Sequence, residues 1–207
     1  MIRVVYLHGF ASGPSSSKAR YFRRVLENAG APVDVPDLAA GDFEHLTVTG
    51  QLRVIENAAG TSPIALIGSS MGGYLAALYA AGHPQVSRLV LLAPAFGFAQ
   101  RWRERFGAAE VEHWQRTGTT EVYHYGDGCM RRLAFGLLPD ADRYPAFPGF
   151  PQPALIFHGA HDDVVPVQYA EEFAGRHANA RLEVLDSGHD LLDQLDYMAA
   201  KVIAFLQ

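Results

Sequence analysis

The sequence contains one cysteine, no excess of positive charge and no repeated or low-complexity segment. Cys129 has no partner for a disulfide within the chain, which is compatible with a reducing compartment. Its neighbours Gly128 and Met130 resemble no catalytic cysteine motif, so we expect a small buried side chain there. The 17 Lys and Arg residues against 22 Asp and Glu residues give a net charge of −5, which offers no electrostatic footprint for nucleic acid or an anionic membrane.

Long apolar runs are also absent. No segment reaches the roughly 18 consecutive apolar residues of a transmembrane helix, so we expect no membrane span. The N-terminal segment enters strand-like sequence at Ile2 and lacks the basic, apolar and small-residue regions of a secretory signal. We therefore expect a cytoplasmic protein, and we expect it to be a monomer or a small homo-oligomer.

A chain of 207 residues with 49% hydrophobic residues is long enough to bury a full core, and we assign residues 1–207 to one domain. Strand-like segments alternate with helical ones, which predicts an α/β fold with about six mostly parallel strands flanked by helices. The strand-like segments are 2–7, 33–35, 64–67, 88–93, 154–158 and 182–185. In such a sheet the site lies beyond the carboxyl ends of the strands, which would gather the loops 8–14, 69–72, 159–165 and 186–190.

The segment around Ser70 combines a short apolar strand with an alanine-rich and leucine-rich helical run. Gly68, Ser70 and Gly72 fill the G-x-S-x-G pattern of a nucleophile elbow, in which the serine sits on a strained turn between strand and helix. Side chains at either glycine would crowd that turn. Ser70 is therefore our candidate nucleophile, although a glycine-rich turn that only packs tightly would have the same pattern.

A serine hydroxyl needs a base to remove its proton and a third group to orient that base. Asp162 follows the fifth predicted strand, and His189 follows the sixth, so both belong to the convergent loops. Asp163 is the adjacent alternative, and the spacing from His158 favours Asp162. We therefore predict that Ser70, Asp162 and His189 form a catalytic triad.

Backbone N–H groups must also stabilise the oxyanion that forms when the serine attacks an acyl carbon. The N–H of Met71 lies where the helix after the elbow begins, and the helix dipole favours negative charge there. Gly9 would allow the loop after the first strand to present the N–H of Phe10. We predict Phe10 and Met71 as the two oxyanion donors.

Taken together, His8-Gly9-Phe10, Gly68-Ser69-Ser70-Met71-Gly72-Gly73, His158-Gly159 with Asp162, and Gly188-His189 resemble the α/β-hydrolase superfamily over the whole chain. The opening segment from Tyr6 to Ala19, joined to the elbow, resembles more narrowly the small YqiA-like bacterial esterases. The resemblance implies hydrolysis of carboxylic esters without a cofactor, by Ser70, Asp162 and His189. Against the superfamily pattern we also expect a minimal sheet, because the one or two strands that many relatives have before the strand 2–7 are absent from this sequence.

Residues 97–153 are too long for a simple crossover, and they stand where this superfamily carries its lid. Phe98, Trp102 and Phe106 lie near one helical face of this segment. We expect a small helical lid in which Trp102 and Phe106 bind the acyl part of a substrate. The alternative is a set of helices that pack on the sheet without touching substrate.

Three other functions use some of the same residues. A thioesterase or an acyltransferase would need the same triad. A zinc site could be formed by His158, His161, Asp162 and Asp163, although no second histidine pair has ligand spacing, and we predict no metal. A ligand-binding relative without catalysis is the alternative of another class. The preferred interpretation is a serine esterase for small to medium acyl chains, with a small-molecule ester as its partner.

Overall fold

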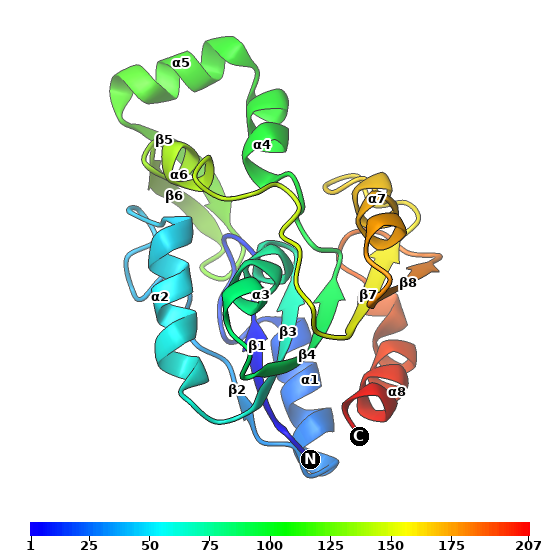
Figure 1. The fold of residues 1–207 in the computed structure, drawn as a ribbon. Coiled ribbons are helices and arrows are strands. Elements are labelled where there is room, and N and C mark those ends of the chain that lie inside the picture. The colour runs from blue at the N-terminus through cyan, green and yellow to red at the C-terminus, as the bar shows by residue number, and fades with distance from the viewer.

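The computed structural model describes residues 1–207, and its centre is a six-stranded parallel sheet in the order β2-β1-β3-β4-β7-β8 (Figure 1). All five pairings are parallel, as the alternation of strands and helices predicted. The strands are β1 (Arg3–Leu7), β2 (Val33–Asp34), β3 (Ile64–Ser69), β4 (Val86–Leu92), β7 (Ala154–Gly159) and β8 (Ala180–Leu185). Every residue of β3 and β7 is buried, which explains their continuous apolar sequences.

Helices cover both faces of the sheet and divide the core in two. One face packs against α2 (Val48–Ala59), α3 (Met71–Gly82) and α7 (Gln168–Arg176). The other packs against α1 (Ser17–Asn28) and α8 (Leu195–Leu206). The 3-10 turn η1 (Leu192–Gln194) directly precedes α8. This arrangement confirms the predicted α/β-hydrolase fold.

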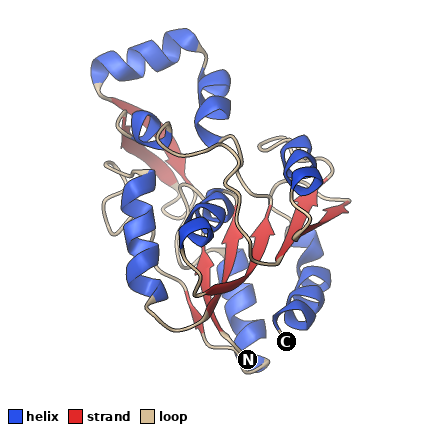
Figure 2. Ribbon diagram, in the orientation of Figure 1, coloured by secondary structure: helices blue, strands red, loops and turns tan.

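Between β4 and β7 the chain leaves the sheet and forms a separate layer over its carboxyl edge (Figure 2). The layer contains α4 (Phe98–Phe106), α5 (Ala108–Thr117) and α6 (Leu137–Ala141). It also contains an antiparallel hairpin of β5 (Thr119–His124) and β6 (Cys129–Ala134), which the sequence analysis did not anticipate. Gly128 closes its turn at φ +68°, a conformation that favours glycine.

Cys129 is exposed, and the expectation of a buried side chain was wrong. The residue begins β6 directly after the turn of the hairpin, in a run of four exposed residues from Cys129 to Arg132. The buried residue of β6 is Leu133, near the other end of the strand, and not Cys129.

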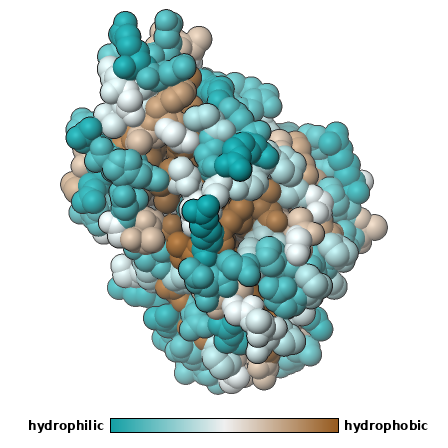
Figure 3. Space-filling model, turned by 60° about the vertical axis from the view of Figure 1, so that its left-hand side comes forward, coloured by the Kyte–Doolittle hydropathy of each residue, from teal (hydrophilic) through white to brown (hydrophobic).

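The surface is mostly hydrophilic in the turned view, and hydrophobic residues show mainly in a hollowed strip across the middle of that face (Figure 3). None of the helices combines the length and the hydropathy that crossing a membrane requires.

Candidate active site

Ser70 lies between the end of β3 and the start of α3, with φ 52° and ψ −114°. Few non-glycine residues adopt a positive φ, and here the buried strand and helix hold it in place. The flanking glycines are sterically required. A Cβ on Gly68 would lie 2.2 Å from the Gly72 carbonyl oxygen, and a Cβ on Gly72 would lie 2.1 Å from that of Leu7.

A hydrogen-bonded chain of three side chains begins at Ser70. Its Oγ lies 3.0 Å from Nε2 of His189, and Nδ1 of His189 lies 2.7 Å from Oδ2 of Asp162. With Asp162 ionised, the ring proton of neutral His189 resides on Nδ1, so that Nε2 can accept the proton of the Ser70 hydroxyl. Ser70, Asp162 and His189 lie in three different loops and are more than 25 positions apart in the sequence. The sheet brings these loops together at one edge.

The carboxylate of Asp162 is buried, and both of its oxygens have polar partners. Its Oδ1 accepts hydrogen bonds from the N–H groups of Val164 (2.9 Å) and Val165 (2.7 Å). Its Oδ2 lies 3.1 Å from Nε2 of His158, which is itself buried. Burial raises the pKa of Asp162, but the hydrogen bonds from His158 and His189 outweigh it and hold the pKa well below its usual range. Asp163, the alternative in the sequence, is exposed.

The contact of His158 with Asp162 was not predicted: from the sequence, His158 served as a motif residue that marks the spacing to Asp162 and as a possible metal ligand. Nε2 of His158 also lies 2.7 Å from the Val165 carbonyl oxygen, so its proton is directed at the loop that holds Asp162. His161 turns away and pairs with Asp186 at 2.9 Å on the surface. The four side chains considered as an alternative zinc site therefore do not converge, and no group of three His, Cys, Asp or Glu side chains is placed to hold a metal ion.

The N–H groups of Phe10 and Met71 both belong to residues that line the cavity beside Ser70. Neither donates to another group of the protein. His8 orients the first of these donors: its Nδ1 lies 2.9 Å from the Gly9 carbonyl oxygen, and its Nε2 accepts from the N–H of Leu38. That carbonyl and the N–H of Phe10 form one peptide group, so fixing one directs the other. Burial lowers the pKa of His8, which favours the neutral ring that these contacts need.

A cavity of about 910 Å³ opens over Ser70, His189 and the two predicted oxyanion donors. Its hydrophobic side includes Phe98, Trp102 and Val165. Trp102 and Phe106 were both predicted to bind the acyl part of a substrate, but only Trp102 lines the cavity. Phe106 stacks on Trp102 (5.5 Å between ring centroids) and contacts Trp114 (5.6 Å) behind it.

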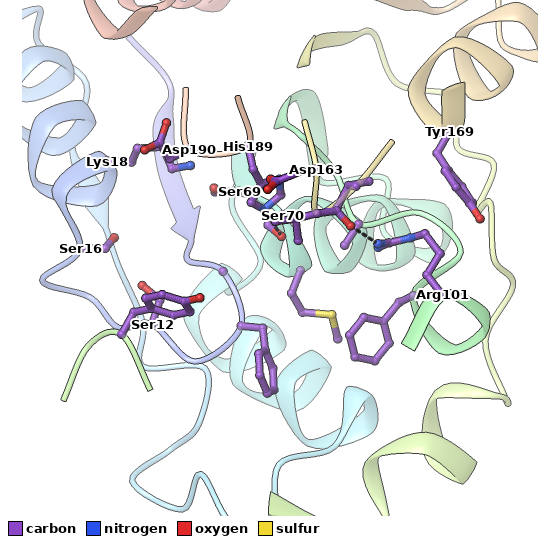
Figure 4. Close-up of a pocket in the computed structure, with 18 of the residues that line it drawn as sticks. Ser12, Ser16, Lys18, Ser69, Ser70, Arg101, Asp163, Tyr169, His189 and Asp190 are labelled. Carbon is purple, nitrogen blue, oxygen red and sulfur yellow. Dashed lines mark hydrogen bonds between the residues drawn. The ribbon is translucent and has the colours of Figure 1, made fainter. Parts of the chain in front are cut away.

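Three cations line this cavity, Lys18, Arg101 and Arg105, and none of them was assigned a role from the sequence. The guanidinium of Arg101 donates to the carbonyl oxygens of Phe96 (2.8 Å) and Val164 (2.9 Å) and lies over the Tyr169 ring. Arg101 therefore ties the layer above the sheet to the loop that carries Asp162. Lys18 enters from the opposite side, beside Asp190 (Figure 4).

Comparison with known proteins identifies the class. The mouse alpha/beta hydrolase domain-containing protein 10 superposes with a TM-score of 0.83 at 17% identity, over 98% of this chain and 88% of the other. Est1E from Butyrivibrio proteoclasticus superposes with a TM-score of 0.80 at 21% identity, over 99% and 86%. Human monoacylglycerol lipase ABHD6 is 25% identical over 97% of this chain and 73% of its own length.

The fold and the arrangement around Ser70 thus define a member of the α/β-hydrolase superfamily. Within that superfamily the chain belongs to UPF0227, described as an uncharacterised protein family, whose sequence profile matches residues 3–207.

Proposed function

We propose that this protein hydrolyses carboxylic esters of small to medium acyl chains through an acyl-enzyme on Ser70. The observation that carries the proposal is the hydrogen-bonded chain from Ser70 through His189 to Asp162, which opens into a cavity with a hydrophobic side. Relatives named as a lipase or an esterase support a hydrolase, and the side chains present suffice for ester cleavage.

In the first half-reaction Ser70 Oγ forms a bond to the acyl carbon while its proton passes to Nε2 of His189. The N–H groups of Phe10 and Met71 would stabilise the oxyanion. When the bond to the alcohol breaks, Nε2 returns the proton to the leaving oxygen. In the second half, His189 takes a proton from water, the resulting hydroxide attacks the acyl carbon, and Ser70 Oγ leaves with the proton.

The layer of residues 97–153 is the proposed lid of this single domain. Trp102 projects from it into the cavity, which supports a role in binding the acyl chain. The cavity volume of about 910 Å³ is compatible with acyl chains of moderate length.

A time course on p-nitrophenyl esters from acetate to palmitate tests the proposal, with wild type compared with Ser70→Ala and with chelator present. We expect turnover that is lost in Ser70→Ala and unaffected by chelator, with a maximum at small or medium chains. Activity that survives Ser70→Ala and is lost with chelator would refute the serine mechanism. Turnover of acyl thioesters alone would assign the same triad to a thioesterase.

A further inference from the structure

Lys18 is a cation without a counter-charge in the wall of the cavity. It lies in the first turn of α1, and no carboxylate oxygen comes within 4.0 Å of its ammonium group. Burial lowers the pKa of Lys18 to about 8, although the charges of Asp190 and Asp162 act to raise it. A cation that is partly removed from water and has no ion-pair partner is costly, so a ligand that supplies negative charge would be favoured there.

Tyr6 is a second polar group without a partner in the same wall. The residue is fully buried on β1, and its hydroxyl makes no hydrogen bond of ordinary geometry. Burial raises the pKa of Tyr6, with the neighbouring Ser69 hydroxyl opposing it, so the phenol keeps its proton and can donate it. Buried hydroxyl groups normally have partners, and the hydroxyl of Tyr6, a residue of the cavity wall, lacks one.

Further hydroxyl groups line this side of the cavity, from Ser12, Ser16 and Ser17. Ser16 caps α1 by accepting from the N–H of Ala19, which leaves its own hydroxyl proton free to donate. The first turn of α1 contains no acidic residue, so the positive end of this 12-residue helix is not neutralised. We call these groups, Tyr6, Ser12, Ser16, Ser17 and Lys18, the Lys18 subsite.

Ser12, Ser16 and Lys18 of the Lys18 subsite lie on one side of Ser70 and His189, whereas Arg101 and Tyr169 lie on the other (Figure 4). The two sides therefore suit different parts of one ester. Arg101 already uses two of its donors on backbone carbonyls, whereas Lys18 uses none. Asp190 is the nearest competitor for Lys18, but it is exposed, and its Oδ1 accepts from the N–H of Leu192.

We propose that the Lys18 subsite binds an anionic group of the substrate, a carboxylate or a phosphate, so that the enzyme prefers esters carrying an acid group. The inference rests on the proposed esterase function and adds a substrate class to it. The ammonium supplies the counter-charge, and the hydroxyl groups supply directed donors for the oxygens of the anion.

Paired esters test the proposal and locate the anion. For the alcohol part, 4-acetoxybenzoate is compared with its neutral methyl ester; for the acyl part, mono-p-nitrophenyl suberate is compared with p-nitrophenyl octanoate. In at least one pair we expect wild type to have the higher kcat/KM for the anionic ester. The pair that shows this preference identifies which side of the scissile bond carries the acid group.

Variants of Lys18 and its neighbour make the assignment specific. Lys18→Met, which keeps the length of the side chain, should lower the anionic-to-neutral ratio of kcat/KM by about tenfold or more. Lys18→Arg should retain much of the preference, and Asp190→Asn should increase it. An equal loss on both esters of a pair, with the ratio unchanged, would overturn the proposal and assign Lys18 to positioning or folding.

A binding measurement separates this proposal from the esterase itself. Calorimetric titration of wild type and Lys18→Met with 4-hydroxybenzoate, its neutral amide and inorganic phosphate needs no turnover, because none of the three ligands contains an ester bond. Binding of an anion that Lys18→Met loses, with no such change for the neutral amide, supports the subsite even if every assay of hydrolysis fails. Failure of both anions to bind wild type, together with equal kcat/KM in both ester pairs, overturns the subsite even where hydrolysis is observed.

Discussion

Exchange of the buried carboxylate for an amide gives the sharpest test of the site. In Asp162→Asn, Oδ1 can still accept from the N–H groups of Val164 and Val165. The amide NH₂ then occupies the place of Oδ2, 2.7 Å from Nδ1 of His189. Because two donors cannot pair, the ring must turn to the tautomer with its proton on Nε2, and that nitrogen can no longer accept the proton of Ser70.

The expected loss in kcat is about 10⁴-fold, equivalent to about 5 kcal/mol in the activation barrier. The amide also faces Nε2–H of His158, so a loss of about 1–3 kcal/mol in the free energy of unfolding accompanies it. Asp163→Asn is the neighbouring control: its side chain also lines the cavity but is exposed and forms no hydrogen bond, so its kcat should fall far less than that of Asp162→Asn.

The measurements are steady-state kinetics on p-nitrophenyl butyrate, urea unfolding, and nitrogen NMR of the His189 tautomer. Retention of kcat within tenfold in a folded Asp162→Asn protein would refute the reasoning, as would an equal loss in Asp163→Asn.

Three further outcomes are expected. Gly72→Ala should lower the free energy of unfolding by about 1–3 kcal/mol and reduce activity, because the new Cβ would lie 2.1 Å from a carbonyl oxygen of β1. Gly82→Ala, in the same helix but with open space at Cβ, should be neutral or stabilising in the same urea titration. Trp102→Ala should change the acyl chain-length profile, whereas Phe106→Ala should lower stability and leave the profile unchanged. The preference for the anionic ester should decline as pH rises through about 8, because free Lys18 loses its charge there, and kcat/KM measured from pH 6.5 to 9.5 checks this.

The same shift has a consequence for stability. The pKa of Lys18 lies below the usual value in the folded protein, so between about pH 8 and 10.5 the unfolded chain binds the proton more tightly. The unfavourable contribution of Lys18 to the free energy of folding is therefore largest below about pH 8 and smallest above about pH 10.5. Lys18→Met should flatten the rise in the free energy of unfolding over that window.

Local chemistry in the sequence determined the elbow and the order of the elements. The requirement for glycine at Gly68 and Gly72 is steric and involves neighbours within a few residues and the adjacent β1, so the motif was sufficient to place Ser70. The fully buried strands β3 and β7 are marked by apolar runs for the same reason: their environment is uniform along their length. The fold class and the family followed from these segments.

Tertiary structure decided what depends on contacts between distant segments. The preference for Asp162 over Asp163 rested on spacing alone, whereas the structure places only Asp162 beside His189, through backbone donors and a buried His158. The hairpin of β5 and β6 and the exposure of Cys129 depend on what lies next to them in space. Tyr6 and Lys18 belong to the segment on which the narrower family resemblance rested, but the sequence did not show that they line one cavity. They come together only where β1 and α1 form the wall of that cavity, and their lack of partners depends on this contact between the two segments.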